Sequence, residues 1–134
     1  MSSKVLRIID ANTNRAVEGL RVMEEVARFV LENKGMTAKL KNMRAKLRNA
    51  AKEINPMLGR KVSSDVGKKS YSESEKKRKS IKDIFTANAK RAQEALRVLE
   101  EFSKLSKPNL GKVFKQVRFK LYALEKQALS QIDL

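Results

Sequence analysis

The sequence contains no cysteine, no histidine and no tryptophan, and it has two prolines and five glycines in 134 residues. Without cysteine or histidine, the chain lacks disulfides, thiolate nucleophiles, the usual general base and the commonest zinc ligands. The scarcity of proline and glycine leaves little material for turns, which favours an all-α fold. No apolar run approaches membrane-spanning length, and no signal peptide is evident at the N-terminus. We therefore expect one soluble, cytoplasmic domain covering residues 1–134.

The chain carries 31 lysines and arginines against 15 acidic residues, a formal net charge of +16. A positive field of this size concentrates anions at the surface, so phosphates are the expected partners. Three functional classes fit: an enzyme acting on a phosphorylated metabolite, a basic helical module that binds nucleic acid, and a non-catalytic scaffold. Lysine-rich stretches at 39–48 and 75–79 favour the second class. The few aromatic residues and the acidic residues within the repeat described next oppose it.

Residues 11–25 recur as residues 87–101, with 10 of the 15 positions identical. The identical polar residues are one asparagine, two arginines and three glutamates per copy. A helical hairpin duplicated only for its core would keep its apolar residues and let the polar ones change. We therefore interpret the repeat as two copies of a half-site. Its candidate residues are Asn12, Arg15 and Glu18 in the first copy and Asn88, Arg91 and Glu94 in the second.

Capping signals divide the chain into four helices. We predict a first helix from a Ser2 or Ser3 cap to about Asn33-Lys34-Gly35, with Gly35 as the left-handed residue after it, and a second helix from a Thr37 cap to about Ile54. The third helix is predicted to start at a capping box of Ser72 and Glu75 and to end before Pro108. The fourth is predicted to have Asn109 as its cap and to cover about Leu110–Gln131. The predicted architecture is a four-helix bundle made of two repeated hairpins. Repeat one covers about 3–54, a connector about 55–71, and repeat two about 72–134.

The connector has no apolar periodicity, and loops of its length inside compact domains are usually functional or disordered. Its Arg60, Asp65, Gly67 and Lys68 would suit a phosphate-contacting loop, although a plain flexible linker is an equal alternative. The glycine spacing does not match the Walker pattern.

On a helical wheel, Asn12, Arg15 and Gly19 fall in the middle of the apolar stripe of the first repeat. Their counterparts in the second repeat do the same. An arginine in such a stripe is costly unless it is paired or faces a ligand. The alternative to a ligand is an ion pair with the glutamate three residues on, Glu18 or Glu94. Gly19 and its counterpart Ala95 would leave space beside each guanidinium.

The other repeated charges have simpler interpretations. Arg21 and Arg97 can pair with the glutamates four residues on, on an exposed face. Glu24 and Glu100 lie near the edge of the apolar arc, and we expect them to be structural.

Four segments of the chain resemble a family of small helical hydroxymethylpyrimidine phosphate kinases of thiamin biosynthesis. That family also occurs as the N-terminal domain of bifunctional thiamin-phosphate synthases. The similar segments are Arg7–Phe29, the connector with Arg60 and Asp65-Val66-Gly67, the second repeat from Ala87 to Arg97, and Arg118 to Glu125. Ala45 and Lys61 depart from the family pattern, which has histidine and aspartate at these positions.

The resemblance implies transfer of a phosphoryl group from ATP to a phosphorylated pyrimidine. Because the acceptor is already an anion, such a reaction needs charge neutralisation and alignment more than a general base. In such a reaction, Arg15 and Arg91 would bind the phosphates, and Glu18 and Glu94 would orient these arginines or bind metal. Asp65 would bind Mg²⁺. The residues expected to bind the substrate are Asn12, Asn88, Arg60, Gly67 and Lys68. Whether the half-sites combine within one chain or across a homodimer is open.

Overall fold

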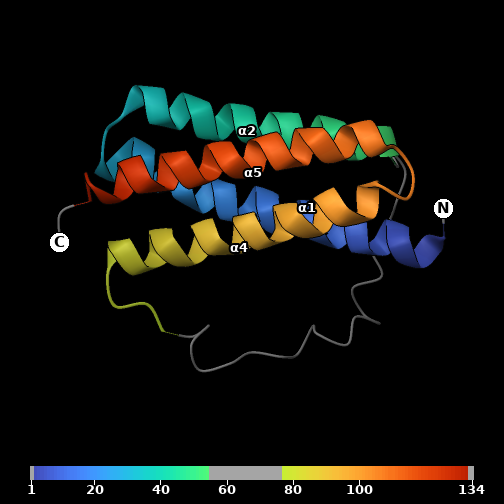
Figure 1. Ribbon diagram of the computed structural model, residues 1–134. Helices are drawn as coiled ribbons and strands as arrows, with labels where there is room; N and C mark the ends of the chain where they lie inside the picture. Colours follow the sequence, from blue (N-terminus) through green and yellow to red (C-terminus); the bar gives the residue numbers. More distant parts are fainter. Residues whose placement is uncertain (1, 55–76, 133–134) are drawn as a thin grey trace.

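The computed structural model describes residues 2–54 and 77–132, and this part of the chain is an all-α bundle, as predicted (Figure 1). The predicted connector and its candidate residues lie outside the described residues. The described elements are α1 (Ser3–Glu25), the π-helical segment η1 (Val26–Val30), α2 (Lys34–Ile54), α4 (Ile81–Ser103) and α5 (Pro108–Leu129).

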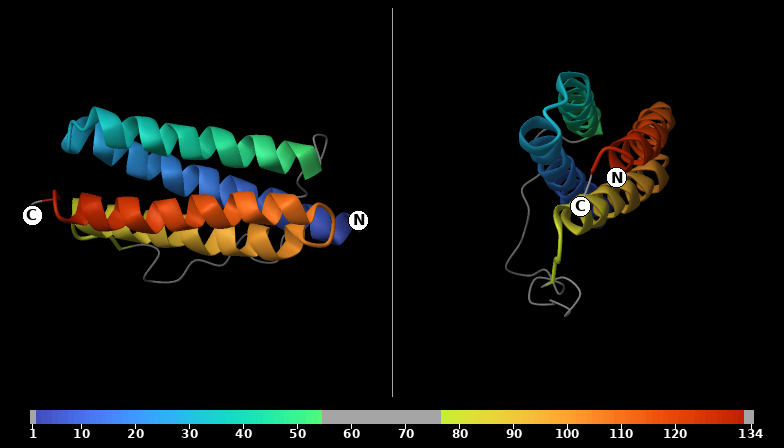
Figure 2. Two further views of the ribbon diagram at one scale, coloured as in Figure 1. Left: turned by 45° about the horizontal axis from the view of Figure 1, so that its top comes forward. Right: turned by 90° about the vertical axis from the view of Figure 1, so that its left-hand side faces the viewer.

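Neighbouring helices run antiparallel in the bundle (Figures 1 and 2). Helix α1 packs against both α2 and α4, and α5 packs against α4 and, less extensively, against α2. The two hairpins, α1–α2 and α4–α5, therefore meet mainly through α1 and α4. Helices α2 and α5 lie on the same side of this α1–α4 pair.

The start of α1 agrees with the sequence, since the Ser2 hydroxyl accepts a hydrogen bond from the Val5 amide at 3.2 Å. The turn into α2 does not. Glu32, with φ of 50°, is the left-handed residue of this turn, and Gly35 already lies in α2. The cap is Asn33, whose Oδ1 accepts from the Met36 amide at 2.9 Å, so the predicted Thr37 cap is wrong.

The second hairpin begins later than predicted, because residues 77–80 are not helical. Ser80 is the cap of α4, and its hydroxyl accepts from the Asp83 amide at 3.1 Å. The predicted Ser72–Glu75 box lies outside the described residues. The predicted Asn109 cap is also wrong, since α5 starts with Pro108 at its first position. Proline suits that position because its fixed φ is helical and its missing N–H needs no partner.

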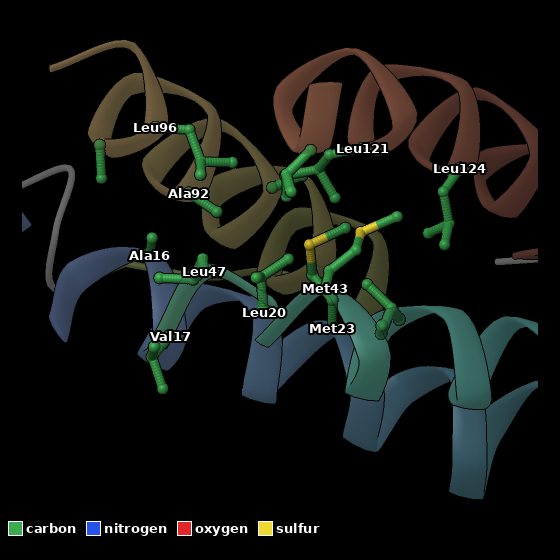
Figure 3. Packing of buried hydrophobic residues seen from close by; sticks show 14 of the residues in the cluster. Ala16, Val17, Leu20, Met23, Met43, Leu47, Ala92, Leu96, Leu121 and Leu124 are labelled. Carbon is green, nitrogen blue, oxygen red and sulfur yellow. The ribbon is translucent and has the colours of Figure 1, made fainter. Parts of the chain in front are cut away.

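The core lies between the four helices, and Figure 3 shows leucine, methionine, valine and alanine side chains from all of them. Leu20, Leu47, Leu96 and Leu121, one from each helix, are completely buried. Truncating such a leucine to alanine costs about 2–5 kcal/mol. Within residues 2–54 and 77–132, charged residues interrupt every helix, and none of these helices has the length and hydropathy to span a membrane.

Candidate functional site

The two repeats meet where α1 and α4 approach most closely, at Gly19. A Cβ atom at this position would lie 2.8 Å from the Asn88 carbonyl oxygen and 3.3 Å from the Ala92 Cβ. Gly19 therefore allows the two helix backbones to come together. It does not serve to make room for a guanidinium, as the sequence suggested. The duplicated segments are thus brought side by side within one chain.

Gly19 contacts both Asn88 and Ala92 of the antiparallel helix α4. If Lys90, midway between them, is taken as the residue level with Gly19, equal counts along the two helices put Arg15 about level with Glu94 and Arg91 about level with Glu18. All four side chains are exposed. No ion pair joins any of them to another residue in the described ranges.

The exposure of Arg15 and Arg91 corrects their predicted position in the middle of the apolar stripe. In α1 the completely buried residues, such as Ala16 and Leu20, lie on the flank of Gly19 that faces α2 and α5. Arg15 lies on the other flank. The predicted alternative, an ion pair between Arg15 and Glu18, is also not formed among the described residues.

We call the side of the α1–α4 pair that faces away from α2 and α5 the open face, and define it by Arg15, Glu18, Arg91 and Glu94. Helical geometry places four half-buried apolar residues beside these charges. They are Ala11 and Val22 of α1 and Ala87 and Val98 of α4. The open face thus combines two guanidinium groups, two carboxylates and a small apolar surface. The guanidinium groups can neutralise phosphates, and the apolar surface can contact an aromatic ring.

The duplicated asparagines adopt the same conformation in both repeats. Asn12 Nδ2 donates to the Ile8 carbonyl, and Asn88 Nδ2 donates to the Ile84 carbonyl, both at 2.8 Å. In the first repeat the Asn12 Oδ1 also accepts a hydrogen bond of 3.4 Å from Arg15 Nη1. The side-chain amide is therefore held by its own helix, with its oxygen directed toward the arginine.

A magnesium ion would find a modest set of ligands on this surface. Among the described residues, no group of three or more acidic side chains gathers in one place. Mg²⁺ commonly needs only one or two carboxylates, because substrate phosphates and water complete its octahedron. Glu18 and Glu94 are the two carboxylates that the open face offers. Asp65, the predicted ligand, lies outside the described residues, as do Arg60, Gly67 and Lys68.

The repeated glutamates Glu24 and Glu100 anchor buried ion pairs, which confirms their structural interpretation. Arg44 of α2 binds one oxygen of Glu24 through Nε at 2.8 Å and Nη2 at 2.7 Å. Arg118 of α5 binds Glu100 through Nη2 at 3.0 Å. Each pair therefore ties the first helix of a hairpin to the second.

The two ion pairs differ in their surroundings. Glu100 has a second partner, Arg97, at 3.1 Å, whereas among the described residues Glu24 pairs only with Arg44. Burial lowers the pKa of Arg118, but hydrogen bonds and charge interactions with Glu100 and Tyr122 outweigh it, so its pKa is raised. Arg118 therefore stays charged throughout the accessible pH range.

These arginine partners were missed in the sequence, although a signal was present. Residues 42–47 read Asn-Met-Arg-Ala-Lys-Leu and residues 116–121 read Gln-Val-Arg-Phe-Lys-Leu. The second helices of the hairpins therefore also repeat, with a shorter offset than the first helices. The predicted exposed pairs are confirmed, with Arg21–Glu25 at 3.1 Å and Arg97–Glu101 at 2.9 Å.

Repeat two has a polar groove of about 400 Å³ between α4 and α5, and Glu94 of the open face is one of its lining residues, together with Arg118 and Tyr122 of α5. Beside it, Gln93 Nε2 donates to Glu125 Oε1 at 2.7 Å. Val17 and Ala51 occupy the equivalent positions in repeat one. Phe119 and Tyr122 form an exposed aromatic pair near the same groove, with ring centroids 6.1 Å apart. The hairpins thus share a framework and differ in their outer surfaces.

Comparison with known proteins identifies the family of the chain. The ThiD2 family model matches residues 7–127. A thiamine-phosphate synthase of Nostoc punctiforme is 46% identical over 123 residues, which cover 90% of this chain and 34% of that protein. Proteins of the same name from a strain of Prochlorococcus marinus and from Rhodopirellula baltica are 46% and 39% identical over 121 and 125 residues. The match to the Prochlorococcus marinus protein covers 90% of this chain and 35% of that protein. The match to the Rhodopirellula baltica protein covers 91% of this chain and 33% of that protein.

The chain thus spans about a third of the length of these relatives. No solved structure matches. Since the family model covers nearly the whole sequence, including both repeats and all four described helices, the chain belongs to the ThiD2 family.

Proposed function

We propose that this protein acts in thiamin biosynthesis as a kinase that converts hydroxymethylpyrimidine phosphate to its diphosphate with ATP. The observation that carries the proposal is the meeting of two Asn-x-x-Arg-x-x-Glu segments across the α1–α4 contact, in a chain of the ThiD2 family. Relatives over most of this chain are named thiamine-phosphate synthases, which supports a place in the same pathway.

The reaction joins two anions. An oxygen of the substrate phosphate attacks the γ-phosphorus of ATP, the bond from that phosphorus to the β–γ bridging oxygen breaks, and ADP leaves with the bond's electrons. The barrier comes largely from bringing the two phosphates together and aligning them, so fixed cations are the main requirement. A chain without histidine can meet it.

The residues of the open face have complementary roles in this proposal. Arg15 and Arg91 bind the acceptor phosphate and the transferred group, because a guanidinium can hold two phosphate oxygens at once. Asn12 orients Arg15 through the 3.4 Å hydrogen bond. Glu18 and Glu94 would hold Mg²⁺, which when bound neutralises charge on the ATP phosphates. The half-buried alanines and valines of the open face would contact the pyrimidine ring.

The direct test incubates the purified chain with ATP, Mg²⁺ and hydroxymethylpyrimidine phosphate and follows the products by phosphorus NMR. We expect the diphosphate and ADP in equal amounts. The unphosphorylated alcohol should react poorly, because the anionic acceptor is what makes a general base dispensable. Absence of diphosphate above background from folded protein would contradict the proposal.

A further inference from the structure

A second groove lies between α2 and α5. These two helices lie on the side of the α1–α4 pair opposite the open face (Figure 2). Its volume is about 510 Å³. We call it the α2–α5 groove. Its lining residues are Lys39, Asn42, Met43 and Lys46 from α2 and Val117, Lys120, Ala123, Leu124 and Gln127 from α5.

The floor of the α2–α5 groove is apolar and its rim is basic. Met43, Val117 and Leu124 are nearly completely buried, and they belong to the core (Figure 3 labels Met43 and Leu124). The rim lysines and amides are exposed. No carboxylate lines the groove, and no described carboxylate forms an ion pair with its lysines. Such an apolar pocket with a few polar groups is typical of small-molecule sites.

Lys46 and Lys120 occupy equivalent positions in the two hairpins, in the segments 42–47 and 116–121. In these segments the repeated arginine serves the buried ion pair, and the repeated leucine is in the core. The repeated lysine does neither, and in both hairpins it lines the α2–α5 groove. The internal repeat thus places two equivalent lysines at one groove, and neither lysine takes part in the core or in a buried ion pair.

We propose that the α2–α5 groove binds a small organic anion, in which a flat apolar ring carries a phosphate, sulfonate or carboxylate. The ring would lie on Met43, Val117 and Leu124, while the anionic group would interact with Lys46 and Lys120. The volume of about 510 Å³ lies within the range of pockets that hold such molecules. This proposal uses none of the open-face residues and does not depend on the kinase activity.

Other occupants fit the α2–α5 groove less well. A second copy of the chain would bring another +16 charge against a lysine rim, which is repulsive. A small ring with one anionic group matches both the size and the charge.

Binding is best followed through methionine methyl groups, because the chain has five methionines and only Met43 among the described ones lines the groove. The probe is 8-anilinonaphthalene-1-sulfonate, titrated into methyl-labelled protein. We expect a saturable shift of the Met43 methyl signal, with a smaller change at Met23 and Met36, which do not line the groove. Inorganic phosphate alone should not displace the probe at comparable concentrations, because it lacks the ring. Failure of Met43 to shift, or displacement by phosphate at such concentrations, would overturn the proposal.

Two groove variants and one matched control sharpen the test. Lys46→Gln with Lys120→Gln should weaken probe binding about tenfold or more, and Ala123→Phe should abolish it by filling the groove. The control pair, Lys41→Gln with Lys115→Gln, removes the same charge from exposed lysines outside the groove and should change affinity less than twofold. Equal weakening by the control pair would reduce the effect to overall charge and overturn the proposal.

Two further measurements separate this site from its alternatives. The probe should bind normally to Arg15→Met, even where that variant has lost kinase activity. Loss of binding there would identify the open face as the probe's site and overturn the proposal. An acidic amphipathic peptide that displaces the probe more effectively than ring phosphates such as AMP would reassign the groove to a protein partner.

Discussion

Replacing Arg44 by methionine should destabilise the protein more than the same change at Arg118, although the two positions are equivalent in the repeat. Arg44 contacts Glu24 through two nitrogens, at 2.7 and 2.8 Å, and both side chains are about nine-tenths buried. Without Arg44, Glu24 becomes a buried charge with no partner in the described structure. Breaking a buried pair in this way costs about 3–5 kcal/mol.

The cost converts to a melting temperature through the unfolding entropy. At about 2.1 cal/mol/K per residue, a chain of 134 residues has an unfolding entropy of roughly 0.28 kcal/mol/K. Arg44→Met should therefore lower the melting temperature by about 11–18 °C. Arg118→Met leaves Glu100 with Arg97 at 3.1 Å, so its cost should be about 1–2 kcal/mol, or roughly 4–7 °C.

Circular dichroism at 222 nm during heating and in urea would measure both effects. The double variant Glu24→Leu with Arg44→Met should recover most of the loss, because an apolar pair of similar size removes the buried charge. Arg21→Met breaks only an exposed pair and should cost less than about 0.5 kcal/mol. The reasoning fails if Arg118→Met is as harmful as Arg44→Met, or if the double variant is no more stable than Arg44→Met alone.

The open face, the helix contact and the net charge can each be tested as well. Arg15→Met and Arg91→Met should each lower kcat/KM at least ~100-fold, about 2.7 kcal/mol of transition-state stabilisation, with little change in melting temperature because both side chains are exposed. Full activity in either variant would exclude that arginine from the site. Gly19→Leu should destabilise by about 3 kcal/mol in urea unfolding, because its Cβ meets the Asn88 carbonyl at 2.8 Å. Gly35→Ala should be neutral or slightly stabilising, because a Cβ at this position would lie 3.6 Å from its nearest neighbour, the Asn33 Oδ1. If Gly19→Leu were no more destabilising than Gly35→Ala, the close contact between α1 and α4 at Gly19 would be contradicted. RNA binding should be weak at physiological salt, and its affinity should fall steeply as the salt concentration rises. A sub-micromolar affinity for RNA at physiological salt, unchanged by added pyrimidine phosphate, would favour the nucleic-acid alternative.

The helices and their pairing into hairpins could be predicted because capping residues, prolines and apolar periodicity act locally. The errors occurred where two local signals competed. Thr37 and Asn33 both suit a cap, and Asn33 takes the position in the turn that follows the π-helical segment η1. Pro108 starts α5 where Asn109 was expected to cap it.

The open face was predicted only in part, because a helical wheel does not show where neighbouring helices lie. Asn12, Arg15 and Gly19 share one stripe, but the position of α2 and α5 buries only one flank of it. Asn12 is buried and Arg15 is exposed, although they are one turn apart. The pairing of Glu24 with Arg44 required a contact between helices, which periodicity within one helix cannot reveal.

The hydrogen bond between Gln93 and Glu125 has a consequence for what a duplicated hairpin in one chain can do. If two identical hairpins associated as separate chains, every substitution would appear twice, and a polar pair gained on one side would be imposed on the other. Covalent linkage removes that symmetry constraint, so repeat one can keep Val17 and Ala51 at the equivalent positions. The buried ion pairs preserve the shared scaffold, while the outer surface of each half can change independently.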